Sequence, residues 1–208
     1  MGRKSRNREL AVWVNGQLAG KWKIPTRGEE EFQYDAAWIK TPEGRPLSLS
    51  LPFSLDNAPI KGKMVGNYFD NLLPDSDPIR QRIQSQFGTD TRTAFDLLAA
   101  LGRDCVGAVQ LLPIGEQPDD VKRIDAKPLT DAQIEGRLKQ AVSASRLRGL
   151  EEDEFRISIA GAQEKFAFLY HDGKWCEPLG STPTTHIFKL PLGLVGGRNA
   201  DMRSSVEN

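Results

Sequence analysis

The stretch LAVWVNGQLAGKWKI, residues 10–24, decides the architecture of the first half of the chain. Its two segments, 10–14 and 17–24, are rich in residues that favour β-strands, and Asn15-Gly16 stands between them. An Asn-Gly pair in this position is the strongest short signal for a β-hairpin, because both central residues of a type I′ turn need a positive φ. The sequence therefore predicts an antiparallel pair of strands here.

Three further strands are expected in the first 112 residues. They cover residues 32–39, with Trp38 as a core aromatic residue, residues 47–51, and residues 106–112. In segment 47–51 leucine alternates strictly with serine, which is typical of a half-buried strand with its three leucines on one face.

Residues 67–103 show a helical rather than an alternating spacing of apolar side chains. Asp75 is expected to cap a helix that extends to Phe87, and Thr91 is expected to cap a second helix, which Gly102 ends. The first part of the chain is therefore predicted to be a small α+β unit.

A proline-rich connector at residues 113–128 follows, with one short strand expected at 121–124. Thr130 and Gln133 form a capping box, in which each side chain satisfies a backbone amide at the start of a helix. This helix is expected to reach Ala144.

The remaining residues predict a second β-unit, with a two-residue turn at Asp172-Gly173. Its strand-like segments are residues 155–159, 165–170, 174–176 and 185–190. The expected fold class is α+β, with a β-rich N-terminal subdomain with short helices at residues 1–125 and an antiparallel sheet unit at residues 126–208.

Composition narrows the class of protein. Apolar residues make up 38% and charged residues 27% of the chain, which excludes collagen-like, coiled-coil and wholly disordered proteins. Lys and Arg together number 28, as do Asp and Glu, so the basic excess typical of nucleic-acid-binding proteins is missing. The longest apolar runs fall far short of the roughly 20 residues that cross a bilayer, and no signal peptide is recognised. Cys105 and Cys176 fit no zinc spacing, so we expect free thiols, no metal site and a cytoplasmic location.

The most informative segment for function is FRISIAGAQEK, residues 155–165. Small side chains let backbone amides approach a ligand closely, and consecutive amides in a turn can form an anion-binding nest. The spacing is not that of a Walker A loop. An ordinary hairpin turn and a phosphate-binding loop both fit the pattern. The residues of this turn are, in order, Ala160, Gly161, Ala162, Gln163, Glu164 and Lys165.

Lys189 lies in an apolar strand, between Phe188 and Leu190. A buried lysine needs an anionic partner, because an unpaired charge is expensive to bury. The pattern fits an outward-facing lysine on an alternating strand. It also fits a lysine that pairs with nucleotide phosphates, as the strand lysine of protein kinases does. Ser158 has no neighbouring His with which it could form a nucleophilic triad, so the pattern assigns no catalytic residue.

Several motifs, taken together and in order, resemble the HipA toxin kinases of bacterial toxin–antitoxin modules. The combination covers nearly the whole chain beyond its N-terminal tail and is far more specific than any one motif. The motifs are RPLSLSLP (45–52), NYFDNLLPD (67–75), FDLL (95–98), GRDCVGAV (102–109), FRISIAGAQEK (155–165) and STPTTHIFKLP (181–191).

The resemblance implies a serine/threonine protein kinase with a distant kinase-like fold. Residues 126–208 would then be part of its ATP-binding N-lobe. Residues 160–165 would form the loop over the phosphates of ATP, which is used with Mg²⁺. Lys189 would contact these phosphates, and Ser158 would be the autophosphorylation site.

The resemblance also implies partners. In the best-known relatives the substrate is glutamyl-tRNA synthetase, and a helix-turn-helix antitoxin of the HipB type neutralises the kinase. The expected partners are therefore such an antitoxin, a protein substrate and the C-terminal half of the same kinase. DNA would be met only through the antitoxin, and no membrane partner is expected.

The chain departs from the family in one respect. The C-terminal half of a family kinase supplies the catalytic Asp, in a motif like Asp-Gly-His-Ala-Lys-Asn, and the Asp that binds magnesium; phosphoryl transfer needs both roles. No such motif occurs here, so the C-lobe is expected outside this chain, and the chain alone is expected to be inactive. The alternative is a stand-alone interaction or antitoxin module from a split kinase system.

Overall fold

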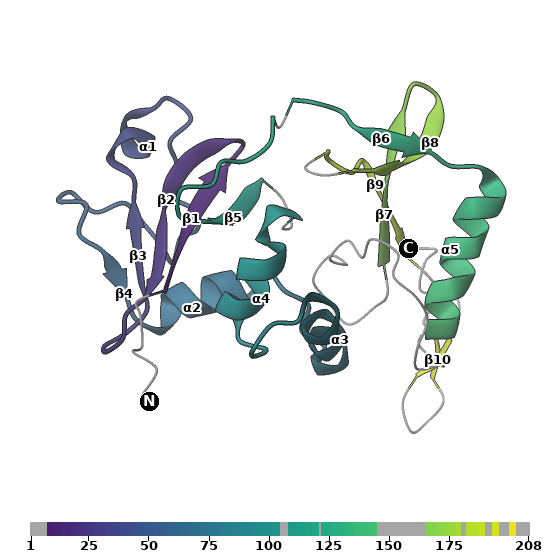
Figure 1. Cartoon of the computed structure of the whole chain (residues 1–208), viewed down its shortest axis with the longest axis horizontal. Coiled ribbons are helices and arrows are strands. Elements are labelled where there is room, and N and C mark those ends of the chain that lie inside the picture. The colour runs from purple at the N-terminus through teal and green to yellow at the C-terminus, as the bar shows by residue number, and fades with distance from the viewer. Residues whose placement is uncertain are drawn as a thin grey trace. The chain divides into compact units, whose positions relative to one another are not determined.

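The computed structural model describes residues 8–104, 108–120, 122–144, 165–179, 182–189, 193–195 and 200–202. The chain forms two compact units, Met1–Val121 and Lys122–Asn208, and each is described by itself. Both units combine helices with antiparallel strands (Figure 1), so the predicted α+β class is confirmed.

A five-stranded antiparallel sheet, in the order β4-β3-β2-β1-β5, forms the centre of the first unit (Figure 1). Its strands are β1 (Arg8–Val14), β2 (Gln17–Ile24), β3 (Glu31–Tyr34), β4 (Ile60–Lys61) and β5 (Val109–Pro113). The predicted hairpin is confirmed, because Asn15 has a φ of 48° and Gly16 a φ of 78°, as a type I′ turn requires. The strand expected at 106–112 corresponds to β5.

Aromatic side chains join this sheet to its helices. The longer helices of this unit are α2 (Lys63–Asp70), α3 (Asp77–Phe87) and α4 (Ala94–Leu101). The fully buried ring of Trp22, on β2, stacks on Phe69 of α2 at a centroid distance of 4.1 Å and meets Phe95 of α4 at 4.9 Å. Such ring pairs contribute about 0.5–1.5 kcal/mol each beyond their buried area, so they fix both helices on the sheet.

The helix caps lie one or two residues later than expected. α3 begins after Ser76 rather than after Asp75, and a proline in its first turn needs no hydrogen-bond partner there. α4 begins after Thr93 rather than after Thr91, because the Thr91 hydroxyl accepts from the backbone N–H of Thr93 instead of capping the helix. Gly102 ends α4, as predicted.

The strand expected at 32–39 is wrong in its second half. β3 stops before Asp35, whose carboxylate accepts a hydrogen bond from the N–H of Ala37 at 2.8 Å. This N-cap starts the short helix α1 (Ala36–Lys40), because it satisfies one of the amides that a helix start leaves free. Trp38 is buried in α1, as predicted for a core aromatic residue.

The strand expected at 47–51 is not formed. The Ser48 hydroxyl accepts from the N–H of Ser50 at 3.1 Å, and the Ser48 carbonyl accepts from the N–H of Leu51 at 3.0 Å, so the segment makes a turn. Leu51 is fully buried whereas Leu49 is 101% exposed, so the leucines do not share a face. Alternation fails as a signal here because serine side chains bond to nearby backbone groups and compete with a strand ladder.

The phenol of Tyr34 holds this turn on the sheet. Its O–H donates to the Leu51 carbonyl at 2.5 Å, and its oxygen accepts from the N–H of Leu47 at 2.8 Å. The Trp38 indole N–H donates to the Arg45 carbonyl at 3.0 Å, at the start of the same segment. Burial raises the pKa of the Tyr34 phenol, and the hydrogen bond from Leu47 lowers this pKa to a smaller extent.

The second unit contains a four-stranded antiparallel sheet in the order β6-β8-β7-β9 (Figure 1). Its strands are β6 (Ala126–Pro128), β7 (Lys165–His171), β8 (Lys174–Pro178) and β9 (His186–Lys189). The predicted turn between β7 and β8 is confirmed by φ values of 48° at Asp172 and 74° at Gly173. A separate antiparallel pair consists of β10 (Gly193–Val195) and β11 (Ala200–Met202).

The helix α5 (Asp131–Ala144) begins at the predicted capping box. The N–H of Gln133 donates to the Thr130 hydroxyl at 3.3 Å, and the side-chain carbonyl of Gln133 accepts from the N–H of Thr130 at 2.9 Å.

The strand expected at residues 121–124 of the connector is wrong, because residues 122–124 form no strand and pairing with β8 begins at Ala126. The strand expected at 155–159 lies outside the described residues. None of the helices described is both long and apolar enough to cross a membrane.

We expect Tyr34→Phe to destabilise the first unit by about 1–3 kcal/mol, because the buried Leu51 carbonyl and the N–H of half-buried Leu47 lose their partner. The folded state favours the neutral phenol, because the pKa of Tyr34 is raised. The contribution of the phenol to stability is therefore complete below its ordinary pKa of 10.0 and is lost as pH rises through the raised pKa. Urea unfolding at pH 8 and at pH 10.5 measures both effects. The difference in stability between the native chain and Tyr34→Phe should shrink at the higher pH; a constant difference would contradict the assignment.

Candidate functional site

Two of the residues that the family resemblance assigns to ATP binding lie on strands of the second unit. Lys165 is the first residue of β7, and Lys189 is the last residue of β9. The other loop residues, Ala160, Gly161, Ala162, Gln163 and Glu164, lie outside the described residues, as does Ser158.

The register of β7 and β9 brings these two lysine positions together. Lys165 and Lys189 are direct partners in the antiparallel ladder, although they are far apart in sequence. The next pair whose side chains share that face consists of Ala167 and Ile187. The structure therefore places basic positions beside an apolar pair at one end of the ladder.

This apolar pair is open to solvent. The Ile187 side chain is 50% exposed, Ala167 is half-buried and Lys189 is exposed. An exposed isoleucine beside an exposed lysine forms a surface that suits a flat apolar group with an anionic end. The sequence analysis missed Ala167 and Ile187; the alternation of His186, Ile187, Phe188 and Lys189 was the signal that could have found Ile187.

The opposite face of β9 packs on aromatic rings, which determines where Lys189 projects. The Phe188 ring lies edge-on to Phe168 of β7 and to Trp175 of β8, each at a centroid distance of 5.1 Å. His186, two residues earlier on the same face, meets Trp175 at 4.8 Å. Since side chains alternate along a strand, Lys189 must project from the other face.

An ion pair fastens α5 to the sheet. Two nitrogens of the Arg137 guanidinium lie 2.5 and 2.6 Å from the two carboxylate oxygens of Glu177 on β8. Both side chains are mostly buried, with 26% and 16% of their areas exposed. This fork-to-fork geometry is the strongest form of Arg–carboxylate contact and supports the sheet from its α5 side.

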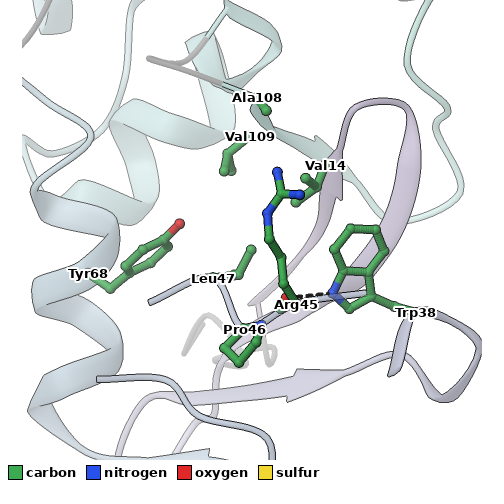
Figure 2. A pocket seen from close by; sticks show the side chains of 8 residues that line it. All are labelled: Val14, Trp38, Arg45, Pro46, Leu47, Tyr68, Ala108 and Val109. Atoms are coloured by element: carbon green, nitrogen blue, oxygen red, sulfur yellow. Dashed lines mark hydrogen bonds between the residues drawn. The ribbon is translucent and has the colours of Figure 1, made fainter. Parts of the chain in front are cut away.

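A small pocket lies in the first unit, where residues 45–47 meet β1, α1, α2 and the start of β5 (Figure 2). Its volume is about 130 Å³. The Arg45 guanidinium extends into it, and the rings of Trp38 and Tyr68 stand on either side (Figure 2). The rest of the lining is apolar and consists of Val14, Pro46, Leu47, Ala108 and Val109. Such a pocket can hold a small apolar group that bears a negative charge.

The metal-binding types of side chain are scattered over the part of the chain that the structure describes. Within these residues, no three His, Cys, Asp or Glu side chains lie close enough together to hold a metal ion. Cys176 is buried on β8, and its Sγ lies 3.8 Å from the Lys174 carbonyl. Cys105 lies outside the described residues.

Comparisons with known proteins agree with this architecture. Residues 10–112 match the family model of the HipA N-terminal domain. The putative kinase Y4mE of Sinorhizobium fredii is 33% identical over 196 residues, which cover 91% of this chain and 45% of that protein. The serine/threonine-protein kinase toxin HipA of Shewanella oneidensis is 25% identical over 157 residues, which cover 76% of this chain and 34% of that toxin.

A solved structure shows the same fold. It is the complex of HipA, HipB and operator DNA from Shewanella oneidensis, and one of its chains matches with a TM-score of 0.62 and 22% identity. The match covers 87% of this chain and 40% of that chain. The chain thus spans less than half the length of the relatives it matches.

The fold and these matches define a class of protein: the chain is similar to the N-terminal portion of proteins related to toxin kinases. More narrowly, residues 10–112 of its first unit belong to the family of HipA N-terminal domains.

We expect Arg137→Met to lower the free energy of unfolding by about 1–2 kcal/mol, because the mostly buried Glu177 loses a charged partner. The matched control is Lys139→Met on the same helix, whose ion pair with Glu135 is exposed, so that its loss should leave the stability nearly unchanged. Urea unfolding followed by circular dichroism measures both. Equal losses for the two variants would show that the Arg137 pair does not hold α5 on the sheet.

Proposed function

We propose that this chain is the nucleotide-binding N-terminal part of a HipA-like serine/threonine protein kinase. In the full-length enzyme the phosphoryl group would pass from ATP to a serine of a translation-related protein. The observation that supports this function best is the exposed Lys189 beside the open Ala167–Ile187 pair, directly opposite Lys165 in the ladder.

The arrangement suits ATP in two ways. Phosphates would lie near Lys189, since an ammonium group is a common ligand of nucleotide phosphates in kinases. The adenine ring would lie on Ala167 and Ile187, because flat apolar groups bind on apolar side chains and leave water.

The loop of Ala160, Gly161, Ala162, Gln163 and Glu164 would close over the phosphates with its backbone amides. ATP would be used with Mg²⁺, which neutralises charge on the transferred phosphoryl group. The residues that hold the metal and orient the attacking hydroxyl are expected outside this chain. We therefore expect the chain alone to bind Mg-ATP weakly and to be inactive.

The proposed protein partner is a HipB-like helix-turn-helix antitoxin. The solved complex that shares this fold contains HipA together with HipB and operator DNA, which supports such a partner. DNA contact would then be indirect. The protein substrate would be a translation-related protein, as glutamyl-tRNA synthetase is for the best-known relatives.

A stand-alone interaction module is the competing function. The pocket of the first unit, with its single cation, is the feature that favours it. Such a module has no need of a nucleotide, so nucleotide binding at Lys189 separates the two proposals.

We expect Lys189→Met to weaken Mg-ATP binding about tenfold or more, because a hydrogen bond to a charged group contributes about 1.5–3 kcal/mol. The titration is followed by backbone amide NMR shifts, which measure weak binding. The control is Lys174→Met, an exposed lysine on the same sheet that pairs with His171 at the other end of β7. It should change the affinity less than twofold. Equal effects of both variants, or no shifts near Ile187 in the native chain, would refute a nucleotide site here.

We further propose that phosphate on Ser158 and bound ATP exclude each other in the full-length enzyme. A phosphoserine adds about −1.5 to −2 charges. Two unit charges 4 Å apart repel by about 4 kcal/mol at an effective dielectric near 20. We therefore expect phosphoserine at position 158 to lower nucleotide affinity at least tenfold, and phosphoserine at exposed Ser50 to leave it unchanged. Equal affinities with and without phosphate on Ser158 would rule out the switch.

A further inference from the structure

The strand that bears Lys189 has little apolar burial to set its register. β9 has four residues, and three of them, His186, Ile187 and Lys189, are exposed. Register is specified strongly only where one face of a strand is buried. A slip by two residues would keep every side chain on its own face, yet it would move Lys189 by about 6.6 Å along β7.

Thr185, one residue before β9, makes the contacts that define the register. Its N–H donates to the Phe168 carbonyl at 3.0 Å. Its hydroxyl oxygen accepts from the N–H of Tyr170 at 2.7 Å. Two β7 residues are therefore bonded to a single residue of the other segment, through its main chain and its side chain.

The Thr185 hydroxyl accepts a hydrogen bond from β7 beyond the end of the regular ladder. The regular ladder between β7 and β9 runs from the Lys165–Lys189 pair to the Phe168–His186 pair. Tyr170 lies beyond the last pair, and the Thr185 oxygen is the acceptor for its N–H. The same hydroxyl lies 2.8 Å from Nδ1 of His186 and 3.5 Å from the Phe168 carbonyl, so its own hydrogen has an acceptor as well.

We propose that Thr185 is a positioning residue that fixes the register of β9 on β7 and so presents Lys189 to the nucleotide phosphates. The second half of this statement rests on the proposed nucleotide site; the first half rests on contacts among described residues alone. A shifted β9 would leave both the Tyr170 N–H and the Phe168 carbonyl without their Thr185 partner. The aromatic contacts of Phe188 favour one face of β9, whereas Thr185 selects one position along it.

The test compares Thr185→Val, which keeps the branched shape and removes the hydroxyl, with Thr185→Ser, which keeps the hydroxyl. The control is Thr184→Val at the neighbouring exposed position. Amide hydrogen exchange of Tyr170 and cross-strand NOEs between β7 and β9 report the register without nucleotide, and Mg-ATP titration reports its consequence. Loss of one hydrogen bond should speed Tyr170 exchange about two- to tenfold in Thr185→Val and weaken Mg-ATP binding by a similar factor. Thr185→Ser and Thr184→Val should stay within about twofold of the native chain.

The outcomes test the role of Thr185 in the register separately from its effect on nucleotide binding. If the native chain binds no nucleotide, the proposed function fails, while exchange and NOEs still decide the role of Thr185. Unchanged Tyr170 exchange and unchanged NOEs in Thr185→Val would overturn the inference. If Thr185→Val does not fold, amide exchange in the native chain still tests the inference. A Tyr170 amide that exchanges as fast as one without a hydrogen bond would overturn it. A Tyr170 amide that is protected in the native chain and remains protected in Thr185→Ser would support it.

Discussion

The antiparallel pairing of β7 with β9 is the constraint on which the proposed site depends. It brings residues some two dozen positions apart in sequence into direct opposition, and it sends Ile187 and Lys189 to one face while Phe188 packs on rings at the other. The Arg137–Glu177 ion pair stabilises this sheet further, because it joins α5 to β8, the strand beside β7. Ile187 and Lys189 are thus exposed on one face, while ring contacts hold β9 on the other.

The first unit is held together by different contacts. Its core depends on the Trp22 ring, which joins one strand to two helices, and its edge depends on the hydroxyl of Tyr34, which holds a turn that has no strand partner. Both are single side chains that connect segments distant in sequence. The unit therefore combines a tightly packed centre with a peripheral segment whose shape is set by a few hydrogen bonds.

The sequence predicts best what is decided locally. The Asn15-Gly16 turn, the Asp172-Gly173 turn and the capping box at Thr130 follow from residue types alone, and each is confirmed. The second half of the strand expected at 32–39 and the strand expected at 47–51 do not form, because side-chain oxygens, of Asp35 and of Ser48, bond to nearby amides and outweigh the apolar pattern. Lys189 was visible as a candidate from its neighbours, and the family motifs gave it a role. Its apolar companions Ala167 and Ile187 depend on the register between two strands, which no local pattern contains.

The turn around Leu49 has a practical consequence. Tyr34 bonds to Leu47 and to Leu51, so both ends of a very short segment are fixed by the same phenol, while the Leu49 side chain between them contacts only solvent. Closing a longer loop between fixed ends costs little extra entropy, since the cost grows only with the logarithm of length. Position 49 is therefore a suitable place to graft a fluorescent label or an epitope, because neither would disturb the phenol anchors or the sheet beneath them.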